Sequence, residues 1–119
     1  MAFDDTFTAE VPKKVVETAA FEEWEGSTSG TNLERVEAAK EKIENEGVIT
    51  SAKSLDDGLY EKKWKSGLRL YFAVVKEKVE TTLLILGSGK GKEQDKAIKE
   101  ARKILGKYTV HKGDIRKRD

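Results

Sequence analysis

The sequence of 119 residues contains no cysteine, one histidine, one proline and one methionine. The absence of cysteine excludes disulfide bonds, thiolate metal sites and a cysteine nucleophile. The single histidine, His111, excludes a metal site or a nuclease centre built from several histidines. No apolar run approaches the roughly eighteen residues that span a bilayer, and residues 1–5 lack the basic and apolar regions of a signal peptide. We therefore expect a cytoplasmic protein that makes no contact with membranes.

The composition is typical of one small domain. Hydrophobic residues make up 37% of the chain and charged residues 38%, which predicts a modest core with room for about three helices and one small sheet. We expect a single domain over residues 1–119, with flexible ends at residues 1–5 and 108–119.

Charge is divided unequally between the two halves of the chain. Residues 1–61 carry six Lys and Arg against fifteen Asp and Glu, a balance of −9, whereas residues 62–119 carry seventeen against seven, a balance of +10. Such asymmetry favours an anionic partner for the second half, and nucleic acid is the usual one. The alternative is that acidic helices simply pack beside a basic sheet.

The chain begins with the pattern of a short strand followed by a helix. Residues 6–11 alternate weakly between apolar and polar and predict a strand. Pro12 suits the first turn of a helix, because its fixed φ angle is compatible with that position and its missing N–H would have no partner there. Apolar residues at helical spacing extend this expected helix to about Trp24.

A second helix is expected after the flexible segment 26–30. Thr31 and Glu34 form a capping-box pattern at its beginning. Gly47 suits its end, where a glycine can adopt the left-handed conformation. The charged residues on its outer side are interpreted as a solvated face.

From Leu59 the hydrophobic period changes from helical spacing to two. This period predicts three antiparallel strands, at residues 59–64, 68–75 and 79–86. Apolar residues at helical spacing then predict a helix at residues 93–105. The tail after residue 106 is rich in charge, and we interpret His111 within it as a solvated residue rather than a catalytic one. The expected fold is α+β: a small, mostly antiparallel sheet, made of the short first strand and a three-stranded meander, packs on two N-terminal helices and is followed by a C-terminal helix.

The first hairpin of the meander should have a three-residue loop, Lys65-Ser66-Gly67. Glycine adopts the left-handed conformation of the last loop position without steric cost. This loop pairs Trp64 with Leu68 and Lys63 with Arg69, which separates an apolar face from a polar one. The apolar face, expected to meet the helices, comprises Tyr60, Lys62, Trp64, Leu68, Leu70 and Phe72. The polar face, expected to be exposed, comprises Glu61, Lys63, Arg69 and Tyr71.

The polar face carries groups suited to phosphate chemistry. Arg69 can bind two phosphate oxygens through its planar guanidinium, and Lys63 adds a second cation beside it. Tyr71 could stack on a base or move a proton. These cations would also stabilise the charge that develops when a ribose 2′-hydroxyl attacks a phosphate. The alternative is that Glu61 forms an ordinary cross-strand salt bridge with Lys63 or Arg69.

The glycine-rich segment 87–92 is a second candidate site for an anion. It lies between an apolar strand and a helix, where free backbone N–H groups and the helix dipole attract anions. It is not a nucleotide-binding P-loop, because the motif GxxxxGK[ST] requires an earlier glycine and a Ser or Thr after the lysine. Neither is present. A loop that contacts phosphate remains consistent with the sequence.

Three segments together resemble the RelE-like toxins, and most closely their HigB-like, phage-derived killer branch. These segments are Gly58-Leu59-Tyr60-Glu61, Gly67-Leu68-Arg69-Leu70-Tyr71-Phe72 and residues 83–89 with Lys90 and Gln94. The family pattern reads GxYELRI, GYRVYF and GGDKSTQ, and the resemblance covers residues 21–108. The chain departs from it at Lys62-Lys63 for Leu-Arg, at Leu68 for an aromatic residue, at Gly87-Ser88-Gly89-Lys90 for GGDK and at Ala97 for an aspartate.

The resemblance implies a toxin of a toxin–antitoxin module that cleaves messenger RNA on the ribosome, without a metal or small-molecule cofactor, and that a cognate antitoxin protein neutralises. By the same resemblance the catalytic residues would be Arg69, Lys63, Tyr71 and Lys90. Arg69 would stabilise the transition state, Lys63 and Lys90 would hold flanking phosphates, and Tyr71 would position a base. Further RNA contacts are expected from Lys65, Lys92, Arg102 and Arg116.

Two other classes of function remain open. Related ParE-like toxins share the fold and bind DNA gyrase, which would make this chain an inhibitor without chemistry of its own. A RelE-like domain without nuclease activity could instead bind only RNA or a partner protein. Salt-dependent RNA binding without cleavage would distinguish that protein from a nuclease.

Overall fold

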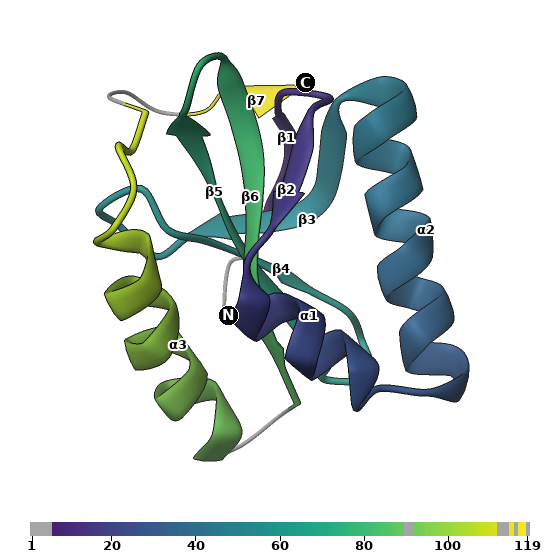
Figure 1. Ribbon diagram of the computed structural model, residues 1–119. Coiled ribbons are helices and arrows are strands. Elements are labelled where there is room, and N and C mark those ends of the chain that lie inside the picture. The colour runs from purple at the N-terminus through teal and green to yellow at the C-terminus, as the bar shows by residue number, and fades with distance from the viewer. Residues whose placement is uncertain (1–5, 90–91, 112–114, 116, 119) are drawn as a thin grey trace, which may run out of the picture.

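The computed structural model describes residues 6–89, 92–111, 115 and 117–118. Within these residues the chain forms an α+β fold around one mixed sheet of seven strands in the order β2-β6-β5-β4-β3-β1-β7 (Figure 1). The strands are β1 Phe7–Glu10, β2 Val15–Glu17, β3 Val48–Ser54, β4 Tyr60–Lys63, β5 Arg69–Lys76, β6 Glu80–Ser88 and β7 Lys117–Arg118. The sheet is therefore larger than the sequence predicted.

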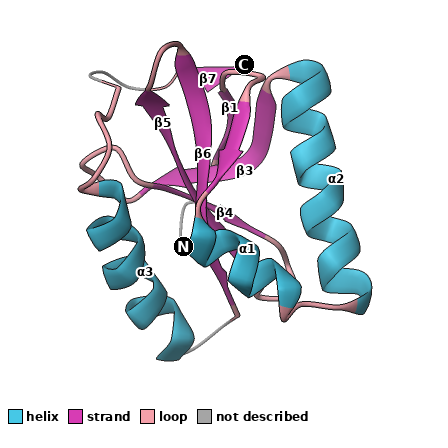
Figure 2. Cartoon of the chain, viewed as in Figure 1, coloured by secondary structure: helices cyan, strands magenta, loops and turns pink. Residues whose placement is uncertain are grey.

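Helices cover both faces of the sheet. Helices α1, Ala19–Gly26, and α2, Gly30–Glu46, pack on one face, and α3, Lys92–Leu105, packs on the other (Figure 2). The first face contributes Leu70, Phe72 and Leu84 to a core with Phe21, Val36 and Ile43 of α1 and α2. The second face contributes Tyr71, Ala73, Val75, Leu83 and Ile85 to a core with Ala97, Ala101 and Leu105 of α3.

The segment that follows Pro12 forms a strand, and the expected helical start at this proline is wrong. Strand β2 pairs in parallel with β6, and the Thr82 N–H donates to the Lys14 carbonyl over 2.9 Å. Helix α1 begins only after Thr18, whose hydroxyl accepts from the Phe21 N–H over 3.0 Å and donates to the Ile85 carbonyl over 2.7 Å. Pairing with β6 thus outweighs the helical spacing of the first valines.

The meander has four strands, because β3 precedes the three strands that were expected. Strand β3 pairs with β4 on one side and with β1 on the other, both antiparallel. Its pairing with β1 is irregular between Phe7 and Ala9, and Ser51 lies in the left-handed region with φ of 55°. This irregularity interrupts the alternation of residues 48–54, which is why the pattern alone did not indicate a strand.

Of the two ends predicted for helix α2, the structure confirms the C-terminal one at Gly47 and not the N-terminal one. It begins at Gly30 with Ser29 as the N-cap residue, so the Thr31 and Glu34 capping box does not form. It ends before Gly47, which is left-handed with φ of 67° and whose N–H donates to the Ile43 carbonyl over 2.8 Å. A glycine is favoured here by that conformation.

The described residues of the C-terminal tail pack on the sheet, whereas a flexible end was expected there. The His111 N–H donates to the Val74 carbonyl over 2.9 Å, and Val110 bridges to Val75. Ile115 is buried in the core formed with α1 and α2, and β7 pairs with β1. The expected flexible N-terminus, residues 1–5, lies outside the described residues.

Candidate functional site

The β4–β5 hairpin has the expected register. Gly67 is left-handed with φ of 97°, and the Trp64 N–H donates to the Leu68 carbonyl over 2.9 Å. Lys63 lies opposite Arg69 in the ladder. These contacts confirm the three-residue loop and the separation of an apolar face from a polar face. The apolar face meets helices α1 and α2, as expected.

The polar face was expected to be exposed, but helix α3 and Gly89 lie against it. Arg69 is 9% exposed, Glu61 4% and Tyr71 0%, whereas the side chain of Lys63 at the hairpin end is exposed. The apolar stripe of α3 must be buried against some surface. Tyr71, Ala73 and Val75 supply that surface, so the helix covers the neighbouring polar residues as well.

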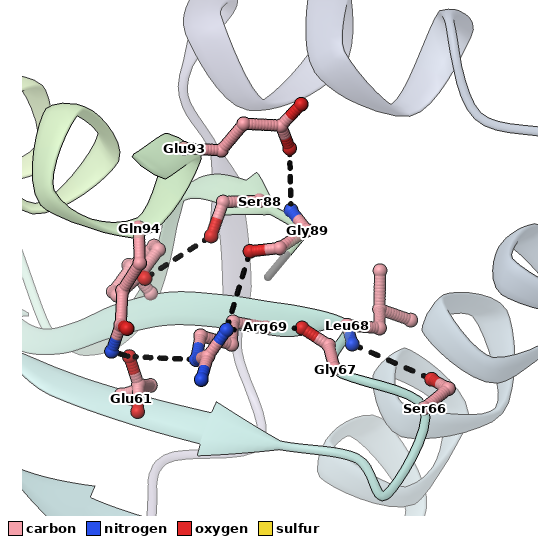
Figure 3. Close-up of polar contacts among 10 residues, drawn as sticks. Glu61, Ser66, Gly67, Leu68, Arg69, Ser88, Gly89, Glu93 and Gln94 are labelled. Carbon is pink, nitrogen blue, oxygen red and sulfur yellow. Dashed lines mark hydrogen bonds and ion pairs between the residues drawn. The ribbon is translucent and has the colours of Figure 1, made fainter. Parts of the chain in front are cut away.

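Arg69 lies in a network of polar contacts between the sheet and the start of α3 (Figure 3). Its Nη1 donates to the carbonyls of Gly67 and Gly89, over 3.2 and 3.3 Å. Its Nε lies 3.6 Å from Oε2 of Glu61. The cross-strand ion pair considered as an alternative therefore exists between Glu61 and Arg69.

The two charged groups of this ion pair do not form a hydrogen bond with each other. The Arg69 Nε is buried and has no hydrogen-bond acceptor among the described residues. Glu61 is held from the other side by Gln94 of α3, whose Nε2 donates to the same Oε2 over 3.1 Å. Since buried donors are nearly always paired, an unpaired guanidinium Nε is a group that a ligand could satisfy.

Tyr71 lies beneath α3 in the same network. Its hydroxyl is 3.1 Å from the Ser88 hydroxyl. Burial raises the pKa of Tyr71 to about 12, a rise that the Ser88 hydrogen bond opposes and the Glu61 carboxylate increases. The phenol is therefore neutral near pH 7, and in this arrangement it offers no face on which a base could stack.

The other expected RNA-binding residues are in different situations. Lys65, in the hairpin loop, is exposed beside Lys63. Arg102 donates to the backbone carbonyls of Leu55 and Asp56 and so connects α3 to the loop before β4. Lys90, Arg116 and the side chain of Lys92 lie outside the described residues.

Sequence reasoning missed a perturbed lysine on the opposite face of the hairpin. Lys62 is 8% exposed, and its Nζ donates to the carbonyl and hydroxyl oxygens of Thr50 over 2.8 and 2.9 Å. Its Nζ also lies 4.8 Å from the centroid of the Trp64 ring. Burial and the nearby Lys42 lower the pKa of Lys62 to about 8. A lysine placed between apolar positions of a strand was the available signal.

His111 pairs with the acidic end of β6 rather than with a catalytic group. Its Nδ1 lies 2.8 Å from Oε1 of Glu80, and both residues line a cavity of about 410 Å³ together with Val11, Val74 and Ile115. Within the described residues, no cluster of three or more His, Asp or Glu could hold a metal ion. None of the described helices combines the length and apolar character that a bilayer crossing requires.

A mostly apolar groove of about 420 Å³ lies between α1, the end of β6 and α3. Trp24, Leu86 and Ala97 form its apolar wall, and Ser88 connects it with the network around Arg69. Glu93, Lys96 and Glu100 form its charged rim.

Comparison with known proteins adds no relative: no protein-family model, no curated protein and no solved structure matches the chain.

Proposed function

We propose that this chain is a RelE-like toxin of a toxin–antitoxin module, a ribosome-dependent mRNA endoribonuclease in which Arg69 binds the phosphate at the cleavage point. Two kinds of observation support the proposal. The segments 58–61 and 67–72 carry the family pattern, and the arginine of that pattern lies at the centre of a polar network. Two N-terminal helices also pack on one face of a largely antiparallel sheet, as the sequence predicted.

The observation that carries the proposal is the unpaired Nε of Arg69. A guanidinium presents its donors in one plane and matches the oxygens of a phosphate. In this network Nη1 is occupied by two carbonyls, while the buried Nε lacks an acceptor among the described residues. A phosphate oxygen at Nε would complete the hydrogen bonding and would bring the charge of a transition state to a fixed cation.

Lys63 and Lys65 would hold the phosphates on either side. Both are exposed at the end of the β4–β5 hairpin, next to the position of Arg69 in the ladder. Lysine suits this role, because a flexible ammonium group neutralises a backbone phosphate without a strict geometry. Lys90 stays a predicted third contact.

A second candidate function has its own supporting observation. Tyr71 is completely buried, and its pKa of about 12 keeps the phenol neutral, so this residue supplies neither a base nor a stacking surface in the present arrangement. A protein with this geometry could bind RNA or a partner protein and inhibit growth without cleaving RNA. The ParE-like alternative, inhibition of gyrase, belongs to the same class.

Expression of the chain under an inducible promoter tests these functions. The expected result is growth arrest with new 5′ ends inside translated messages, because ribosome-bound mRNA is cut. Arg69→Ala should reduce cleavage by about 100-fold or more, since it removes the charge that stabilises the transition state. Mapping of transcript ends provides the measurement.

Arg35→Ala is the matched control, because Arg35 is a half-buried arginine on α2, on the other side of the sheet, where its Nη1 donates to Oδ1 of Asn32 in the same helix. This variant should cleave as the wild type does. Growth arrest with intact transcripts would support the second function, and an assay of plasmid supercoiling would then identify gyrase inhibition. Absence of arrest would contradict both functions, and rescue by an adjoining short reading frame would identify the antitoxin.

A further inference from the structure

The contacts around Arg69 contain a carboxylate that competes with any incoming phosphate. Glu61 lies opposite Tyr71 in the ladder, and its Oε2 is 3.6 Å from the Arg69 Nε. A phosphate oxygen that accepts a hydrogen bond from the Nε–H must occupy nearly the same place. Glu61 and an RNA phosphate are therefore alternatives at one side of the guanidinium.

The existing pair is weaker than its charges suggest. A bidentate arginine–carboxylate pair has two parallel N–H···O bonds of about 2.8 Å. Here the Nε approaches Oε2 only to 3.6 Å and makes no hydrogen bond. Both side chains are nearly buried, so each has lost most of its hydration without gaining a hydrogen bond from the other. An anion with better geometry could displace the carboxylate.

Helix α3 determines where the carboxylate lies. Gln94, in the first turn of α3, donates to the same Oε2 over 3.1 Å, so one carboxylate oxygen contacts both Gln94 and Arg69 (Figure 3). The same turn is fastened to the end of β6, because the Gly89 N–H donates to Oε2 of Glu93 over 3.0 Å. The position of α3 and the neutralisation of Arg69 are thus connected through one amide.

We infer that Glu61 is an internal counter-ion that masks Arg69 from RNA phosphate, and that Gln94 holds it in the masking position. The inference rests on the proposed function for the identity of the anion. It predicts that loss of the Glu61 charge, or of the Gln94 amide, increases the affinity of Arg69 for phosphate. The opposite role, in which Glu61 orients Arg69 for binding, predicts that the same changes reduce this affinity.

The Nε–Hε signal of Arg69 in a nitrogen–proton NMR spectrum provides a direct measurement. This proton is buried. We therefore expect it to exchange with water more slowly than the Nε protons of the more exposed arginines, and its absence from Arg69→Lys assigns it. Inorganic phosphate is titrated into the wild-type chain, Glu61→Gln and Gln94→Met. We expect Glu61→Gln to bind phosphate about tenfold more tightly than the wild type, and Gln94→Met to change in the same direction by a smaller factor.

Glu77→Gln is the matched control, because it removes one negative charge from an exposed residue after β5, and it should change the affinity less than about twofold. Unchanged or weaker binding in Glu61→Gln, or an equal gain in Glu77→Gln, would overturn the inference. If Glu61→Gln fails to fold because Arg69 loses its counter-ion, the phosphate affinity of Gln94→Met tests the inference, since this variant keeps the charges of both Glu61 and Arg69.

A labelled oligoribonucleotide separates this inference from the proposed function. Tighter phosphate binding in both variants, together with no RNA binding and no cleavage, would contradict the function and leave the masking role intact. Cleavage by the wild type, together with weaker phosphate and RNA binding in Glu61→Gln, would keep the function and contradict the masking role. Tighter binding of phosphate and RNA supports both.

Discussion

At the scale of single residues, two neighbouring cations of the β4–β5 hairpin, Arg69 and Lys62, have different electrostatic surroundings. Arg69 has a carboxylate beside it, and Arg cannot lose its proton. Lys62 lies on the opposite face, where its Nζ contacts the oxygens of Thr50 and the ring of Trp64 and is repelled by the nearby Lys42. Burial and this repulsion lower the pKa of Lys62 to about 8. The free energy of unfolding should therefore depend on the protonation of Lys62.

Lys62→Met tests this dependence. The folded pKa of about 8 is below the unfolded value of 10.5, so the unfolded chain binds more protons between these values and wild-type stability rises as pH increases through that window. Relative to Lys62→Met, the wild type should gain about 2–3 kcal/mol in unfolding free energy between pH 7 and pH 10.5. Urea denaturation of both proteins at several pH values measures this difference, in which the titration of other groups cancels. A constant difference across the window would contradict the shift.

The sequence predicted the hairpin register from single residues, but not which of them are buried. Gly67 and the separation of apolar from polar positions determined the pairing of Lys63 with Arg69. Exposure depends on what lies against a face, and this is not a property of the hairpin itself. Strand β5 did contain a signal, because the uninterrupted apolar run of residues 70–75 is typical of a strand buried on both faces.

At the scale of elements, the side chains of strand β6 stop alternating regularly between the two sides of the sheet near Ile85. The pairing with β5 shifts between Tyr71 and Phe72, where Leu84 and Leu86 oppose consecutive residues. Ile85 and Leu86 consequently both lie on the α3 side, and Gly87 lies against Trp24 of α1. Strict alternation does not predict this arrangement, since a bulge changes the phase of the strand.

Gly87→Ala tests the contact between β6 and α1. A Cβ atom at position 87 would lie 2.3 Å from two atoms of the Trp24 ring, so the ring must move. We expect a loss of about 1–3 kcal/mol in unfolding free energy. In a Trp24→Leu background the same change should cost at least about 1 kcal/mol less, measured as a double-mutant cycle.

Gly26→Ala is the control for this prediction, because a Cβ atom there would meet nothing within 4 Å. It should leave the stability unchanged or raise it by up to about 1 kcal/mol, because alanine loses less conformational entropy than glycine when it enters a helix. Equal costs of Gly87→Ala in both backgrounds would show that Trp24 is not the obstacle.

At the scale of the whole molecule, contacts between distant segments close the core beside α1 and α2. Lys40 of α2 pairs with Glu17 of β2 and Glu25 of α1, over 2.8 and 2.9 Å. The tail returns to the opposite edge of the sheet, where Ile115 enters the core and its N–H donates to the Tyr60 hydroxyl over 3.4 Å. The end of the chain therefore completes a core that already contains residues of its first strand.

Ile115→Ala tests the contribution of the tail. Ile115 is 6% exposed, and removal of its buried methyl groups should cost about 2–4 kcal/mol in unfolding free energy. Thermal denaturation followed by circular dichroism would detect the corresponding drop in Tm. Val79→Ala, at a valine that is 53% exposed, should change Tm little. A similar Tm for Ile115→Ala and the wild type would show that the tail does not stabilise the core.

The sequence by itself determined the α+β class, the end of α2 at Gly47, the register of the β4–β5 hairpin and the helical stripe of α3, because each depends on local backbone preference or on periodicity. Only the tertiary structure decided that residues 15–17 form a strand, because β6 supplies their hydrogen bonds. It also decided that the polar face around Arg69 is covered, because α3 must bury its apolar stripe and the sheet offers Tyr71, Ala73 and Val75. In the folded chain, Arg69 of the basic half pairs with Glu61 of the acidic half. The charge split of the sequence did not indicate this contact.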